Sequence, residues 1–171
     1  AQCYEPARRD DLDEFCEWLD DDAIYFAALT EEGAFAGVSV AFPLERVPNL
    51  DGPAQDTTLN EGRTLYSAEV AVDTAHRGKG LGRALKDAQI AAAMLATSAD
   101  GEPRYDFVTG RNRVGATDTM MGINAAYGGF EASRHYEQYG DPDGVCVYYR
   151  IPLTSPRLPL AAAPPTDELL D

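Results

Sequence analysis

Apolar and polar residues alternate along the chain with two different periods, and together these periods predict a mixed α/β sheet. Short apolar runs that are typical of strands occupy residues 24–29, 35–42, 64–73, 105–109 and 145–151. The sequence Thr30-Glu-Glu-Gly33 predicts a tight turn that joins the first two runs as a hairpin.

Three further segments show helical spacing. Asp10 or Asp11 can cap a first helix, whose apolar positions are Leu12, Phe15, Cys16 and Leu19. A second helix is predicted over residues 81–97, with a buried stripe of Leu85, Ala88, Ala92 and Leu95. A third is predicted over residues 117–126, before Gly128 and Gly129.

Two connections and one end of the chain lack such periodicity. Residues 43–62 contain three prolines and predict a long loop of the kind that borders binding sites. Residues 111–113 are expected in a second loop. We expect one domain over residues 1–151 and a Pro- and Ala-rich tail or linker over 152–171. Because Ala1 stands first, the chain is expected to be processed or taken from a larger protein.

The net charge of −15 argues against nucleic acid or an anionic membrane as a partner. Residues 73–113 differ, since they carry seven basic and five acidic side chains and so favour an anionic ligand. Three widely spaced cysteines and two histidines form no metal-binding pattern, so we expect no metal and a reducing, cytoplasmic location. No apolar run approaches the length of a membrane span.

The most informative segment is the glycine-rich turn at residues 76–82, His-Arg-Gly-Lys-Gly-Leu-Gly. It lies between a predicted strand and a predicted helix, where glycines allow several backbone amides to converge on an anion. Positive charge surrounds it at Arg77, Lys79, Arg83 and Lys86. These features predict a pyrophosphate-binding turn.

Two common phosphate-binding motifs do not fit this turn. A P-loop requires Lys-Ser or Lys-Thr after its last glycine, and the sequence has none there. A dinucleotide-binding fingerprint requires a glycine where Arg83 stands. The remaining pattern is R-x-x-G-x-G, which begins at Arg77 and ends at Gly82.

This pattern resembles the coenzyme A turn of the GNAT superfamily of acyl-CoA N-acyltransferases. Residues 4–12 are similar to the opening strand and first helix cap of that family, and Met120, Asn124 and Phe130 occupy positions of a second family motif. The resemblance extends over about residues 2–151. It implies an α/β fold with a mixed, mostly antiparallel sheet flanked by helices on both faces.

The resemblance also implies an activity, the transfer of an acetyl group from acetyl-CoA to a primary amine. A small-molecule or peptide amine, cationic in view of the acidic chain, would be the acceptor, and a homodimer is compatible with the family. The expected coenzyme-binding residues are Val70, Val72, Arg77, Gly78, Lys79, Gly80, Leu81, Gly82, Arg83 and Asn124.

Two catalytic roles follow from the same resemblance. Glu69, one residue before Val70, is expected to act as the general base that neutralises the amine. Tyr127 is the candidate proton donor to the leaving thiolate, with Tyr136 and Tyr139 as rivals.

Other functions remain open at this point. The domain could hold an acyl-CoA without turnover as a regulatory module of a larger protein. It could also transfer a longer acyl group, or use a hydroxyl or a carrier-protein thiol as acceptor.

Overall fold

The computed structural model of the chain describes residues 12–153, apart from the side chains of residues 12–14 and 139. The predicted opening strand, the aspartate cap, Cys3 and the segment after residue 153 lie outside this range.

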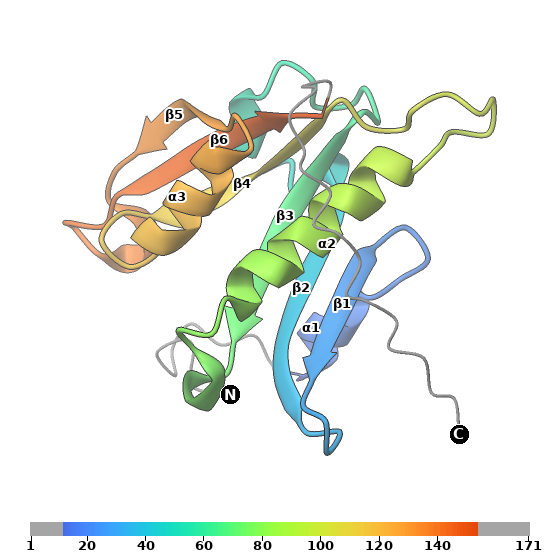
Figure 1. Cartoon of the computed structure of the whole chain (residues 1–171). Coiled ribbons are helices and arrows are strands. Elements are labelled where there is room, and N and C mark those ends of the chain that lie inside the picture. Colours follow the sequence, from blue (N-terminus) through green and yellow to red (C-terminus); the bar gives the residue numbers. More distant parts are fainter. Residues whose placement is uncertain (1–11, 154–171) are drawn as a thin grey trace.

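The described residues form a single sheet with helices on each side (Figure 1). Its strands are β1 (Ile24–Leu29), β2 (Phe35–Pro43), β3 (Thr64–Val72), β4 (Phe107–Arg113), β5 (Phe130–His135) and β6 (Cys146–Pro152). The helices are α1 (Leu12–Glu17), α2 (Leu81–Leu95) and α3 (Asp118–Ala126).

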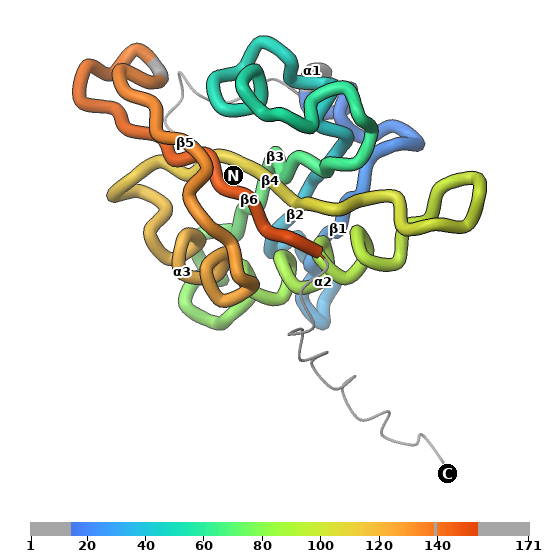
Figure 2. The backbone as a smooth tube through the Cα atoms, turned by 90° about the horizontal axis from the view of Figure 1, so that it is seen from above, coloured from blue at the N-terminus to red at the C-terminus, as the bar shows by residue number. Residues whose placement is uncertain are grey.

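The strand order is β1-β2-β3-β4-β6-β5, and only the β3–β4 pair is parallel. Helix α2 packs across β1, β2 and β3, while α3 contacts β4 and β6. Figure 2 shows α1 on the opposite side of the sheet from α2 and α3. The predicted mixed, mostly antiparallel sheet with helices on both faces is therefore confirmed.

Alternation along the strands divides the core between the two faces of the sheet. On the side of α2, Ile90 and Ala93 pack with Leu65, Val108 and other strand residues. On the side of α1, Phe15 and Trp18 pack against the cluster that contains Val40, Phe42 and Tyr66. The Trp18 and Phe42 rings meet edge to face at 5.9 Å between centroids.

The strand predictions fail in two places. Residues 111–113 are not a loop, because they continue β4 and pair with β6, as in the pair Arg111 and Tyr148. Strand β5 escaped prediction because it is an edge strand of mostly exposed, polar residues with no apolar period.

The predicted stripe of α2 is also incorrect in part. Leu85 is buried as expected, but Leu95 is 81% exposed. The face that meets the sheet is instead formed by Leu85, Lys86, Gln89, Ile90 and Ala93. Two polar residues of this helix therefore point into the interior.

The long connection between β2 and β3 is fastened to the sheet by a buried carboxylate. The Tyr148 hydroxyl donates to Asp56 Oδ2 at 2.6 Å, and the backbone amide of Thr58 donates to Asp56 Oδ1 at 2.9 Å. The Arg150 guanidinium lies 3.3 Å from the same carboxylate, whose side chain is fully buried. Burial raises the pKa of Asp56, but these hydrogen bonds and the charge of Arg150 outweigh it and hold the pKa below its usual value.

Replacing Asp56 by Asn should therefore destabilise the fold in a pH-dependent way. Because the folded-state pKa is lowered, the stabilising contribution is present above the unfolded pKa and is lost as the pH falls through the folded pKa. We expect Asp56→Asn to lower the free energy of unfolding by about 3 kcal/mol at neutral pH, since Arg150 keeps an unpaired buried charge.

Urea unfolding at pH 7 and at about pH 3 tests this expectation, and the deficit should shrink at the lower pH. Asp100→Asn, at an exposed carboxylate, is the matched control and should change stability by less than about 0.5 kcal/mol. Equal effects of the two substitutions would show that Asp56 does not anchor the connection.

Candidate active site

The glycine-rich turn joins the end of β3 to the start of α2. Asp73 accepts a hydrogen bond from the amide of Ala75 and so begins a short 3₁₀ turn at Thr74–His76. Gly78 and Gly80 then adopt φ angles of +75° and +81°, a region that only glycine enters without strain. Gly80 is the N-cap of α2, so the turn ends at a helix N-terminus.

This turn presents backbone donors at the positive end of a helix dipole. Within residues 12–153, no backbone carbonyl accepts a hydrogen bond from the amides of residues 78–83, and the next amide, that of Ala84, donates to Gly80 O at 3.0 Å. Residues 77–80 are exposed. Such an arrangement favours an anion.

The basic side chains around the turn have different roles. The Arg77 guanidinium donates to Val72 O at 3.2 Å, which ties the turn to β3. Arg83 lies 3.8 Å from Asp87 one helical turn further on, and Lys79 is exposed. The prediction that Lys86 adds charge around the turn is wrong, because this residue of α2 is fully buried between the helix and the sheet.

Strands β3 and β4 separate on the way to this turn. Their parallel pairing ends at Ser67 and Gly110, yet β3 continues to Val72 and β4 to Arg113 (Figure 1). A β-bulge occurs at the same point, because Ser67 pairs with Ala41 of β2 while Glu69 pairs with the preceding residue of β2. The two strands therefore open into a wedge, which we call the β3–β4 splay, whose closed end is at Ser67 and Gly110.

The predicted residues on β3 divide between the two faces of the sheet. Paired residues of antiparallel strands share a face, so Glu69, opposite Val40, faces the side of α1. Val70 and Val72 face the side of α2, where Val72 lies beside Gly82. All three β3 residues are half-buried. The splay thus lies between a carboxylate on one face and the glycine turn on the other.

The two predicted residues of α3 lie among protein partners. Asn124 is buried and donates from Nδ2 to Asn112 Oδ1 at 2.8 Å. Tyr127 caps the end of α3, its hydroxyl donates to Asp87 of α2, and the Arg83 guanidinium lies over its ring. Asn124 therefore borders β4 beside the splay, whereas the Tyr127 hydroxyl is held between the two helices.

A buried lysine at the closed end of the splay was missed by the sequence analysis. Lys86 Nζ donates to Ser67 Oγ at 2.9 Å, Gln89 Oε1 at 2.9 Å and Tyr149 Oη at 3.1 Å. Burial lowers the pKa of Lys86 to about 7. The only available signal was its position in the helix, one residue after the apolar Leu85.

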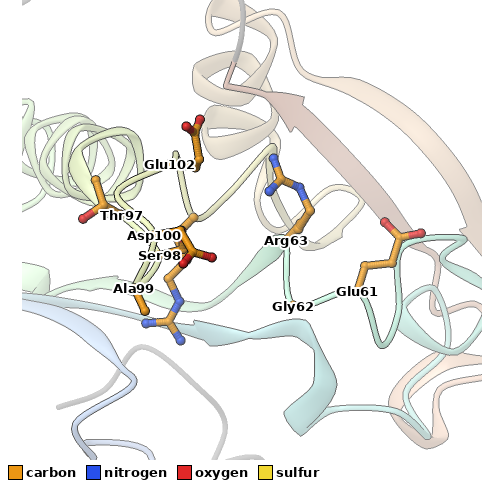
Figure 3. A pocket seen from close by; sticks show the side chains of 9 residues that line it. Glu61, Gly62, Arg63, Thr97, Ser98, Ala99, Asp100 and Glu102 are labelled. Atoms are coloured by element: carbon orange, nitrogen blue, oxygen red, sulfur yellow. The ribbon is translucent and has the colours of Figure 1, made fainter.

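A separate hollow of about 600 Å³ lies at the other end of β3 (Figure 3). Its lining includes Glu61, Arg63, Ser98, Asp100 and Glu102. Because β3 begins at Thr64 and the glycine turn follows Val72, this hollow is not continuous with the turn.

Among the described residues, no group of three or more acidic, histidine or cysteine side chains is placed to hold a metal ion. The same part of the chain contains no helix that is long and apolar enough to cross a membrane.

Comparison with known proteins agrees with the fold. The sequence model of the Acetyltransferase (GNAT) family matches residues 1–99, and the chain belongs to this family. A search of curated proteins finds no match.

Solved structures with the same fold are distant in sequence. Arabidopsis thaliana NAA60 in complex with acetyl-CoA has a TM-score of 0.62 at 14% identity, over 86% of each chain. The ribosomal-protein-S18-alanine N-acetyltransferase from Escherichia coli has a TM-score of 0.59 at 16% identity, over 86% of this chain and 80% of the other. The spermidine/spermine N-acetyltransferase SpeG from Vibrio cholerae has a TM-score of 0.53 at 12% identity, over 79% and 69%. At these identities the likeness establishes the fold alone.

The buried lysine predicts an unusual pH dependence of stability. Lys86 has a folded pKa of about 7 and an unfolded pKa near ~10.4, so between these values the unfolded chain binds the extra proton. This group therefore makes the protein more stable as the pH rises from 7, by up to about 1.4 kcal/mol per pH unit. Lys86→Met removes the contribution.

Urea unfolding of the wild type and Lys86→Met at pH 7 and pH 9 measures this effect. The stability of the variant relative to the wild type should be greatest at pH 7 and fall by up to about 2.7 kcal/mol at pH 9. Parallel pH profiles for the two proteins would mean that Lys86 keeps its ordinary pKa.

Proposed function

We propose that the protein is an N-acetyltransferase that moves an acetyl group from acetyl-CoA to a primary amine. The observation that carries this proposal is the glycine turn at the open end of the β3–β4 splay, with a carboxylate on the far face of the sheet. Membership of the acetyltransferase family and the likeness to a fold solved with acetyl-CoA support it.

Coenzyme A fits the turn and the splay chemically. The amides of residues 78–83 and the helix dipole would hold the pyrophosphate, and the charges of Arg77, Lys79 and Arg83 would add attraction. The extended backbone at Val70 and Val72 leads from the turn toward the closed end of the splay, where it can hydrogen-bond the amides of the pantetheine arm. Asn124 would border the arm from the side of α3.

Glu69 is proposed as the general base for the amine. An ammonium group cannot attack a carbonyl, so the acceptor must lose a proton to a base, directly or through water. Glu69 lies at the bulge of β3 and faces the side of α1, so the amine would approach from that face while the coenzyme occupies the other. A backbone N–H at the bulge would stabilise the oxyanion that develops on the thioester carbonyl.

The acceptor is proposed to be cationic. A net charge of −15 attracts ammonium groups at long range. Among the proteins that share the fold, one is named as an alanine N-acetyltransferase of ribosomal protein S18 and another as a spermidine/spermine N-acetyltransferase. Peptide N-termini and polyamines are therefore the first acceptors to test.

Gly80→Asp should weaken coenzyme binding without unfolding the protein. A carboxylate at this position would repel the pyrophosphate, and Gly80 has open space where its Cβ would stand. We expect calorimetry to show a Kd for acetyl-CoA raised at least about tenfold, or about 1.4 kcal/mol.

Gly101→Asp is the matched control, because Gly101 has the same φ of +81°, open space around it and a place far from the turn. It shares the charge change and the backbone strain of the Gly80 variant. Equal affinity losses in both variants, or none in Gly80→Asp, would place the coenzyme elsewhere.

Glu69→Gln should separate binding from turnover. Thiol release is followed with acetyl-CoA and a panel of polyamines, aminoglycosides, amino acids and peptides. With the best acceptor we expect kcat to fall about 10²- to 10³-fold, as for the loss of a general base, while the Kd of acetyl-CoA stays within about twofold. If the protein binds acetyl-CoA but transfers acetyl to no amine of the panel, and Glu69→Gln changes neither thiol release nor the Kd, the non-catalytic binding domain would be favoured.

A further inference from the structure

The buried ammonium of Lys86 has a complete set of hydrogen-bond acceptors. An ammonium carries three N–H donors, and Nζ has three neutral partners: Ser67 of β3, Gln89 of α2 and Tyr149 of β6, all at 2.9–3.1 Å. The site therefore accommodates the protonated form, although no carboxylate is among these partners. A fully buried lysine without a counter-ion is costly and needs an explanation.

This cluster lies where the β3–β4 splay closes. A Cβ on Gly110 would stand 2.5 Å from the Tyr149 hydroxyl and 2.9 Å from Ser67 O, so the hydroxyl lies directly against the last paired residues of the two strands. Because residue 110 is a glycine, there is room here for the Tyr149 hydroxyl. An arm that entered the splay from the glycine turn would meet the last paired residues, Ser67 and Gly110, beside this hydroxyl.

The cluster is on the opposite face of the sheet from Glu69. Ser67 pairs with Ala41, which belongs to the core on the side of α2, whereas Glu69 pairs with Val40 on the side of α1. An acyl transfer needs a base where the amine enters and an acid where the thiolate leaves. Because of the bulge in β3, Ser67 and Glu69 face opposite sides of the sheet although they are only two residues apart. A base and an acid can therefore lie on opposite faces at this point.

We propose that Tyr149 is the proton donor to the coenzyme A thiolate that leaves in the reaction, and that Lys86 then reprotonates Tyr149. This inference rests on the function proposed above. As the C–S bond breaks, sulfur takes the bonding electron pair and accepts the proton of the Tyr149 hydroxyl. The tyrosine oxygen in turn accepts a proton from Lys86 Nζ, which becomes a neutral amine and regains its proton from solvent.

The acidities of the two groups explain why both are needed. Burial raises the pKa of Tyr149 to about 12, although Ser67 and Asn124 lower it, so alone it is a weak donor to a thiolate whose acid titrates near ~8.5. Burial lowers the pKa of Lys86 to about 7, so transfer from its ammonium to the thiolate is downhill. The two transfers, from Lys86 to Tyr149 and from Tyr149 to sulfur, form a proton relay, which we call the Lys86–Tyr149 relay. This relay delivers an acidic proton to the splay.

Few other titratable groups face this relay. Among the described contacts of Lys86, β3 and α2 contribute the neutral Ser67 and Gln89, and β6 contributes Tyr149. From α3, the neutral Asn124 reaches Tyr149. The nearest charges on α2, Arg83 and Asp87, pair with each other, and Asp87 also accepts from Tyr127. This contact engages the Tyr127 hydroxyl away from the splay.

The test compares Lys86→Met and Tyr149→Phe with Tyr105→Phe. Tyr105 is a buried tyrosine of the same core whose hydroxyl has no hydrogen-bond partner in the described part of the chain, so its variant controls for the loss of a buried hydroxyl. Calorimetry with acetyl-CoA measures binding, and circular dichroism checks the fold. Thiol release with the best amine of the screen measures kcat between pH 6 and 9.5.

We expect kcat to fall about 100-fold in Lys86→Met and in Tyr149→Phe, with the Kd of acetyl-CoA within about threefold of the wild type. Tyr105→Phe should stay within about twofold. The wild-type kcat should decline as the pH rises above about 7, where Lys86 loses its proton, and this decline should be absent in Lys86→Met.

Three outcomes would overturn the relay, and they distinguish its failure from the failure of the proposed function. A wild type that does not bind acetyl-CoA overturns the proposed function and, with it, the relay. A wild type that binds and transfers, while Lys86→Met and Tyr149→Phe keep its kcat and pH profile, overturns the relay alone. A 100-fold loss in Tyr127→Phe with normal turnover in Tyr149→Phe would assign the proton to Tyr127 instead.

Discussion

Pairing between β3 and β4 ends at Ser67 and Gly110, and the position of the candidate site follows from this break. Two features accompany the separation at these residues. A bulge changes the register between β3 and β2, and the Tyr149 hydroxyl lies against Gly110. The resulting wedge leads from the closed core to the N-terminus of α2. Without it, a continuous sheet would separate the glycine turn from Glu69.

This geometry gives each face of the sheet a distinct chemistry. The α2 face carries exposed backbone amides, basic side chains and the buried Lys86, all of which favour negative charge on a phosphate or a sulfur. The α1 face carries Glu69, in a chain whose overall charge is strongly negative, which favours an incoming ammonium group. In the proposed reaction, the acetyl donor and the acceptor would therefore approach from opposite sides of the sheet.

The sequence predicts well what local chemistry determines. Glycines at 78 and 80 indicate the turn because positive φ angles follow from residue type, and the apolar runs of β2 and β3 identify central strands. It predicts poorly what tertiary contacts determine. Strand β5 exists because it pairs with β6. The sequence places Lys86 among the charges of the turn, whereas the fold surrounds it with Ser67, Gln89 and Tyr149. The anchor at Asp56 likewise joins residues nearly a hundred positions apart.

A crystal structure of the protein with coenzyme A would show whether the cosubstrate occupies the glycine turn and the β3–β4 splay. We expect the pyrophosphate to lie within hydrogen-bond distance of the amides of residues 78–83 and the pantetheine arm to lie between β3 and β4, with its sulfur near Tyr149. Coenzyme A in the hollow lined by Arg63 and Glu102, or β3 and β4 paired beyond Gly110 with no space for the arm, would contradict this expectation.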